Sequence, residues 1–198
     1  AGGNPDAELA DASQSPYFLG FTMLMLACNT GHKNIVDVLL QRRASINKRL
    51  PRKGHNALTF AGMCGDPLII TKLLDSGALV NEPSFIGDTV LHHTSAQGSV
   101  SAVVTLLERG ASIDHQDNDG QSALLIACMG GRADIVSTLI ERGASINLQN
   151  KDGISALMYA AQEGHTTVLR TLLNAGARTD LRDIRRASAM DYAKSYGQ

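Results

Sequence analysis

The sequence predicts an all-α solenoid in which pairs of short helices stack as successive layers. The main support is a period of 33 or 34 residues that separates the members of three independent residue sets. Two sets are glycines: Gly31, Gly65, Gly98, Gly131, Gly164, Gly197 and Gly77, Gly110, Gly143, Gly176. The third set is apolar: Leu24, Leu58, Leu91, Leu124, Leu157 and Met190. A fixed period of this length is typical of repeats that each form one unit and stack into a continuous core.

Each period contains two amphipathic patterns, which predict two helices. The first pattern has the spacing i, i+3, i+4, i+7 of one helix face, as in Leu24, Ala27, Cys28 and Gly31. The second is an apolar stripe, as in Ile35, Val36, Leu39 and Leu40. The pair Asp66 and Pro67 fits an N-cap and a first-turn proline, so it begins a helix. Glycines of the second set fit the left-handed position that follows a helix end.

A polar, turn-rich segment follows each second helix, as at residues 118–120 and 151–153. We call these segments fingers and number them in chain order. Each unit is therefore expected to read helix, short turn, helix, finger. A single unit cannot bury its apolar face alone, so stacking against its neighbours must supply the core.

The repeated motif resembles that of the ankyrin family, Gly-x-Thr-Pro-Leu-His-x-Ala-Ala-x-x-Gly-His. Residues 20–32 read Gly-Phe-Thr-Met-Leu-Met-Leu-Ala-Cys-Asn-Thr-Gly-His, and residues 153–165 read Gly-Ile-Ser-Ala-Leu-Met-Tyr-Ala-Ala-Gln-Glu-Gly-His. The resemblance implies an ankyrin-repeat solenoid with hairpin-like fingers and a role in protein–protein interaction. Two departures are Arg43, at a cap-glycine position, and Arg186, in place of the glycine of the last finger. A left-handed arginine costs roughly 1 kcal/mol.

The same register divides the chain into a short leading segment and a repeat domain. Residues 1–16 do not continue the pattern, and we expect a flexible tail or a short N-terminal cap there. Residues 17–198 form the expected ankyrin-repeat domain, with repeats at about 18–50, 51–83, 84–116, 117–149 and 150–182 and a partial repeat at 183–198. We expect this domain to be a monomeric part of a larger chain.

Composition narrows the possible functions. The formal net charge is −1, which gives no overall attraction to nucleic acid or to a membrane surface. No apolar run approaches the ~20 residues of a membrane helix, so we expect no membrane insertion. Cys28, Cys64 and Cys128 are too few for a disulfide scaffold. They indicate free thiols in a reducing compartment, and therefore an intracellular location, cytoplasmic or nuclear.

The sequence contains no recognisable catalytic motif. A phosphate-binding loop and a nucleophile elbow are both absent. None of the six histidines has the spacing of a zinc motif. We therefore expect no enzyme activity, no cofactor and no metal, with the histidines in structural or surface roles.

One row of first-helix positions is the candidate binding groove. These positions are rotated about the helix axis away from the buried stripe. They are occupied by Leu26, Phe60, His93, Ile126, Tyr159 and Tyr192. Met129 and Tyr196 occupy neighbouring positions. In ankyrin proteins this row lines the concave groove, and exposed aromatic side chains there are typical binding hot spots. The alternative is that the row packs one repeat against the next.

The fingers supply the second part of the candidate site. The first finger is basic and includes Arg49, Arg52 and Lys53, and the last includes Arg182 and Arg185. The middle fingers carry acids such as Glu82, Asp88, Asp114 and Asp117, and the tip of the second carries the apolar pair Phe85 and Ile86. We interpret this distribution as a partner surface that is basic at both ends, with ordinary solvated charge as the alternative.

The expected partner is a protein or peptide lying along the groove, with charged fingers that set its direction. Nucleic acid is not expected, since no continuous basic stripe with interleaved aromatic residues is present. An alternative function is that of a structural spacer or regulatory segment within a larger scaffold, channel or enzyme.

Overall fold

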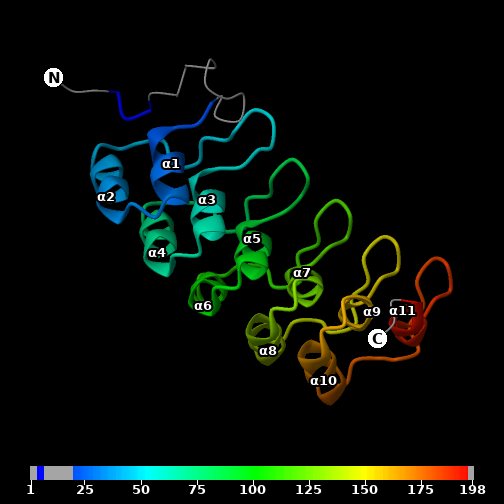
Figure 1. The fold of residues 1–198 in the computed structure, drawn as a ribbon. Helices are drawn as coiled ribbons and strands as arrows, with labels where there is room; N and C mark the ends of the chain where they lie inside the picture. Colours follow the sequence, from blue (N-terminus) through cyan, green and yellow to red (C-terminus); the bar gives the residue numbers. More distant parts are fainter. Residues whose placement is uncertain (1–3, 7–19, 196–198) are drawn as a thin grey trace.

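The computed structural model describes residues 4–6 and 20–195, and the described residues form helices and loops without a strand (Figure 1). Five helix pairs follow one another, and a last helix ends the array. Their bounds are α1 Met23–Asn29, α2 Lys33–Gln41, α3 Ala57–Cys64, α4 Pro67–Asp75, α5 Val90–Gln97, α6 Val100–Glu108, α7 Ala123–Met129, α8 Ala133–Glu141, α9 Ala156–Gln162, α10 Thr166–Asn174 and α11 Ala189–Ser195. In the described part of the chain, no helix combines the length and the hydropathy needed to cross a bilayer. The fold is thus an all-α repeat solenoid, as the period predicts.

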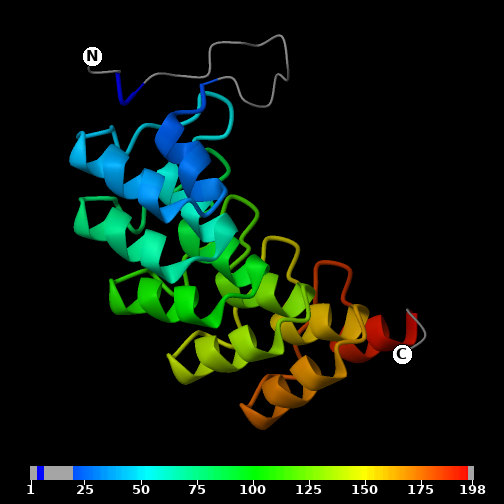
Figure 2. The same cartoon turned by 60° about the vertical axis from the view of Figure 1, so that its left-hand side comes forward.

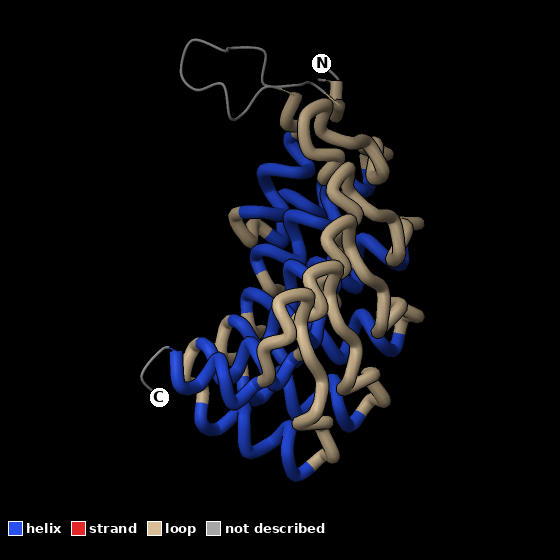
Figure 3. The backbone as a smooth tube through the Cα atoms, turned by 90° about the vertical axis from the view of Figure 1, so that its right-hand side faces the viewer, coloured by secondary structure: helices blue, strands red, loops and turns tan. Residues whose placement is uncertain are grey.

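The helices form two parallel rows, which Figures 1 and 2 show as successive layers. Each first helix contacts the first helix of the next pair, from α1 against α3 to α9 against α11. Each second helix contacts its own counterpart in the same way, from α2 against α4 to α8 against α10. The fingers project from the side of the first helices and lie next to one another along the array (Figure 3). The first helices and the fingers therefore share one face of the molecule.

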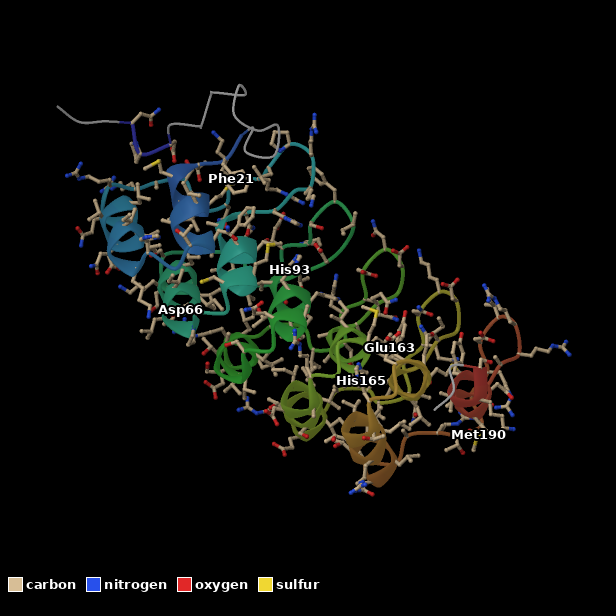
Figure 4. All side chains as sticks on the ribbon, viewed as in Figure 1. Phe21, Asp66, His93, Glu163, His165 and Met190 are labelled. Carbon is tan, nitrogen blue, oxygen red and sulfur yellow. The ribbon has the colours of Figure 1, made fainter. Side chains whose placement is uncertain are left out.

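The apolar residues that define the period form the core between layers. Leu24, Leu58, Leu91, Leu124 and Leu157 are all buried. The last member of the set, Met190, is 63% exposed. Its helix, α11, is followed by no further helix among the described residues, so one side of Met190 remains uncovered (Figure 4).

Polar residues begin the helices where the motif predicts them. Thr22 Oγ1 accepts a hydrogen bond of 3.2 Å from the Met25 N–H, and Asn56 Oδ1 accepts one of 3.0 Å from the Thr59 N–H. These bonds satisfy amide groups that have no partner within the helix. Asp66 caps α4 with Pro67 in the first turn, as predicted.

The two arginines at predicted glycine positions adopt the expected conformation. Arg43 has φ 59° and Arg186 has φ 65°, both in the left-handed region. The backbone geometry of the repeat is therefore kept even where the favoured residue is absent. The strain is local, because Arg43 and Arg186 are both exposed.

A ladder of backbone hydrogen bonds joins the finger tips. The Phe85 N–H donates to Lys53 O at 3.0 Å, and the Asn118 N–H donates to Ile86 O at 2.9 Å. The same bond recurs from Lys151 to Asp119 and from Ile184 to Asp152. Because each finger is tied to the next, the finger face is one continuous ordered surface.

Side chains at the base of the fingers add a second set of links between repeats. Asn81 Oδ1 accepts a hydrogen bond of 2.8 Å from the Ser112 N–H, and Asp114 Oδ1 accepts one of 2.9 Å from the Ser145 N–H. Asp6 does the same for the first repeat, since the Ser45 N–H donates to Asp6 Oδ1 at 2.7 Å. Apart from residues 4–6, the leading segment predicted as tail or cap lies outside the described residues.

Candidate partner-binding surface

Two large aromatic residues of the predicted groove row, Phe60 and Tyr159, are buried, so the prediction of exposed anchors was wrong for them. Phe60 is 6% exposed and Tyr159 is 8% exposed. The Phe60 ring lies 4.7 Å from the Phe21 ring centroid and meets the His55 ring edge-on at 5.9 Å. Phe60 therefore packs between layers, under the first finger.

Tyr159 is held under the fingers by hydrogen bonds. Its hydroxyl accepts a bond of 2.6 Å from Gln121 Nε2 and one of 3.2 Å from Asn150 Nδ2. Gln121 lies just before α7, the first helix of the preceding pair, and Asn150 lies in the finger before α9. A large side chain in this row fills the space where two fingers meet the helices. The fingers therefore cover it, and it is buried.

The other row members remain partly accessible. Leu26, His93 and Ile126 are half-buried, and Met129 is 45% exposed. Tyr192 is also half-buried, and its hydroxyl donates to Asp183 Oδ2 at 2.9 Å. Tyr196 lies outside the described residues. The accessible part of the row is thus aliphatic and sulfur-containing more than aromatic.

Tyr192 and Arg185 line the same pocket. This pocket, of about 250 Å³, opens between the last described finger and the helices α9 and α11. Its walls include Asp152, Gln162, Asp183, Ile184, Arg185 and Tyr192. Arg182 is exposed on the same finger, where its guanidinium donates to Leu181 O at 3.1 Å.

The second finger carries two adjacent exposed apolar side chains at its tip, beside exposed cations of the first finger. Phe85 is 54% exposed and Ile86 is 60% exposed, while Arg52 and Lys53 are exposed on the adjoining finger. The Arg49 guanidinium lies 4.8 Å from the Phe85 ring centroid, within cation–π range. We call Arg52, Lys53, Phe85 and Ile86 the finger 1–2 patch.

Arg49, predicted as a partner-binding residue of the first finger, is half-buried and makes contacts within the fold. Its guanidinium donates to Glu82 Oε1 at 2.7 Å, to Gly54 O at 3.1 Å and to Pro83 O at 2.6 Å. These contacts tie the first finger to the second. They also position Phe85, whose ring lies against the same guanidinium.

Four of the acids on the middle fingers are engaged in the fold or buried, whereas Asp119 is exposed. Glu82 pairs with Arg49 at 2.7 Å, and Asp114 accepts from Ser145. Asp117 Oδ1 accepts from the Gln121 N–H at 2.8 Å, and Asp88 is 8% exposed. The exposed charges of the finger face therefore include cations together with the acids Asp119 and Asp152.

Three residues that sequence reasoning did not associate lie together beneath the second finger. His93 Nε2 lies 3.0 Å from Asp88 Oδ2, and His55 Nε2 lies 4.0 Å from the same oxygen. One ligand atom from each residue lies within 4.8 Å of the others, a spacing that can hold a metal ion. The expectation of no metal rested on linear spacing alone, which does not reveal residues that stacking brings together from different repeats.

A signal for this cluster was present in the repeat register. His55 and Asp88 occupy the same position in successive repeats, 33 residues apart, and Gln121 follows at the same interval. His93 occupies the row position of Phe60 and Tyr159. Because Tyr159 contacts Gln121, the same rule places His93 beside His55. Stacking brings equivalent positions together.

The three cysteines are unpaired thiols, as the sequence predicts. Cys28, Cys64 and Cys128 are free. Burial raises the pKa of the Cys28 thiol to about 12, with Cys64 adding to the effect, and burial raises that of Cys128 to about 12. A thiol with so high a pKa is a poor nucleophile at neutral pH.

The sequence matches a model of a known protein family. A family model described as ankyrin repeats, three copies, matches residues 4–84, 65–150 and 91–183. Comparison with curated protein sequences gave no match. The matched segments together cover residues 4–183, which is most of the chain. The chain therefore belongs to the ankyrin-repeat family.

Proposed function

We propose that the chain binds a protein partner on its finger face, with the finger 1–2 patch as the centre of affinity. Ankyrin repeats are generally protein–protein interaction modules. The observation that carries the more specific proposal is the exposure of Phe85 and Ile86, 54% and 60%, on an ordered finger tip. Adjacent apolar side chains on a folded surface, rimmed by charge, are typical of an interaction site.

The patch is preorganised by its neighbours. The Phe85 N–H bonds to Lys53 O, Ile86 O accepts from the Asn118 N–H, and Arg49 lies against the Phe85 ring. Little backbone freedom is therefore lost when a partner covers the two side chains. Preorganisation of this kind raises affinity by lowering the ordering cost of binding.

Charge indicates the chemistry of the partner segment. Arg52 and Lys53 are exposed beside Phe85, whereas the nearby acids Glu82 and Asp88 are paired or buried. A segment that combines apolar and acidic side chains fits this patch. Further contacts along the face would use the accessible Leu26, Ile126 and Met129, with Arg182, Arg185 and Tyr192 at the far end.

The test is affinity capture followed by mass spectrometry, with a matched pair of variants. Phe85→Ala/Ile86→Ala removes the patch, whereas Ile35→Ala/Leu68→Ala removes two exposed apolar side chains, 44% and 55% exposed, from α2 and α4 in the other helix row. We expect proteins captured by the wild type to be retained by the control pair and lost by the patch pair. A purified partner should bind the patch variant at least about 30-fold more weakly. Equal capture by both variants would exclude this patch.

A further inference from the structure

The cluster of His55, Asp88 and His93 is the one group in the described residues that combines metal-ligand chemistry with suitable spacing. His55 lies in the finger before α3, Asp88 in the finger before α5, and His93 on α5 itself. Figure 4 labels His93 on α5, where this helix stacks beside α3. The three residues therefore come from two neighbouring repeats and meet at the junction between them.

The cluster leaves several buried polar atoms without a hydrogen bond. His55 Nε2, His93 Nε2 and Asp88 Oδ1 are buried and have no hydrogen-bond partner among the described residues. The 3.0 Å approach of His93 Nε2 to Asp88 Oδ2 is close in distance but not aligned as a hydrogen bond. Buried polar groups are nearly always satisfied in folded proteins. Three such atoms in one cluster therefore point to a ligand.

The environment of the cluster shifts the pKa of two of its side chains. Burial lowers the pKa of His55 to about 4, with the neighbouring His93 contributing in the same direction. Burial acts to raise the pKa of Asp88, but polar contacts with His93 and Ser84 outweigh it and bring that pKa to about 2.

We propose that His55, Asp88 and His93 bind a Zn²⁺ ion that links the second and third repeats. Two imidazoles and one carboxylate are a donor set that zinc accepts. Tetrahedral zinc with bonds of about 2.0–2.1 Å holds its ligand atoms roughly 3.3 Å apart. The two measured nitrogen–oxygen separations, 3.0 and 4.0 Å, lie on either side of that value.

Three protein ligands leave one zinc position for a water molecule. The His93 side chain keeps 18% of its exposure, whereas those of His55 and Asp88 keep 7% and 10%. His93 is thus the most exposed of the three side chains, although its Nε2 atom is itself buried. Because the ion would bind the folded array and not the unfolded chain, it would stabilise the contact between α3 and α5.

The test uses protein stripped with a chelator and then freed of it. Calorimetric titration with ZnCl₂ should show one site, and zinc should raise the thermal unfolding midpoint. Substitution with Co²⁺ should give visible absorption without a near-ultraviolet thiolate band, which separates this site from one built on Cys28 or Cys64. A thiolate band, or the absence of zinc binding at roughly 100 µM free zinc, rules the proposal out.

The chain itself offers variants that keep the packing. His93→Phe places at this row position the residue found at Phe60, and Asp88→Gln places there the residue found at Gln121. Each should lower zinc affinity by at least about 100-fold and abolish the zinc-dependent rise of the midpoint. The control His32→Ala removes an exposed histidine and should bind like the wild type. Zinc affinity unchanged in both ligand variants would overturn the proposal.

Discussion

Gln121 Nε2 donates a hydrogen bond of 2.6 Å to the hydroxyl of Tyr159, a residue 38 positions later in the chain and one layer away in the array. Asn150 Nδ2 donates to the same hydroxyl, and Tyr192 repeats the relation one unit later through Asp183. The first-helix row was predicted to bind a partner. Its member Tyr159 instead holds the fingers against the helices. Loss of binding on mutation of this residue would report loss of structure.

The first prediction concerns the Tyr159 hydroxyl. Tyr159→Phe should lower the free energy of unfolding by about 1–3 kcal/mol, because Gln121 Nε2 and Asn150 Nδ2 would lose their acceptor in a buried place. Tyr159→Ala should cost more, about 3–5 kcal/mol, since it adds a cavity. Chemical denaturation measures both. A Tyr159→Phe variant as stable as the wild type would show that the two amides find other partners.

The second prediction concerns the close approach of neighbouring fingers. Gly120 has φ +78°, and a Cβ added there would lie 2.8 Å from the backbone nitrogen of Lys151. Gly110 has φ +84°, but a Cβ there would meet nothing within 4 Å. Both alanine variants should carry about 1 kcal/mol of left-handed strain. Gly120→Ala should lose clearly more, because its neighbour is backbone and cannot move aside.

The difference in stability between these two variants reports the contribution of the close packing between finger tips. If Gly120→Ala and Gly110→Ala unfold at the same denaturant concentration, the finger tips are not held as closely as the Asp119–Lys151 hydrogen bond indicates. Amide hydrogen exchange of Lys151 gives a second measurement. Its protection should fall in the Gly120 variant alone.

The third prediction concerns the left-handed arginine. Arg43→Gly should stabilise the protein by about 0.5–1 kcal/mol, because removal of roughly 1–2 kcal/mol of strain exceeds the entropy that glycine adds to the unfolded chain. The φ of 59° is the structural basis. The control Arg42→Gly, at a neighbouring residue with φ −86°, should destabilise. A lower unfolding midpoint for Arg43→Gly would show that the arginine side chain makes a compensating contact.

The fold could be predicted from the sequence because the same period governs core burial, helix capping and backbone conformation. Leu24 and its equivalents up to Leu157 are buried, Asp66 caps its helix, and Arg43 is left-handed, each as the register requires. These features depend on local spacing and on contacts that repeat identically from layer to layer. Met190 is exposed because the last described layer lacks the contacts that bury its equivalents.

The site was harder to predict because side-chain partners change from layer to layer. Phe60 and His93 occupy equivalent positions, yet one packs against Phe21 and the other faces Asp88. Exposure in this row depends on which residues the two adjoining fingers supply, and helix geometry alone does not contain that information. Placing equivalent positions of successive repeats beside one another would have identified the His55–Asp88–His93 cluster.

The fourth prediction concerns stability in acid. Burial lowers the pKa of His55 from its ordinary 6.5 to about 4, with His93 and Lys53 acting in the same direction and Asp88 opposing them. Between these two pH values the His55 imidazole is protonated in the unfolded chain and neutral in the folded chain. The resulting stability is fully present above pH 6.5 and is lost as the pH falls toward 4.

This loss should be on the order of 1 kcal/mol between pH 7 and pH 5.5, measured by urea denaturation with a chelator present so that metal plays no part. Burial lowers the pKa of His92 as well, so the wild type should weaken in acid through both residues. His55→Gln removes one contribution and should flatten the pH dependence while leaving that of His92. Equal slopes in the two proteins would mean that His55 is protonated in the folded state as readily as in the unfolded chain.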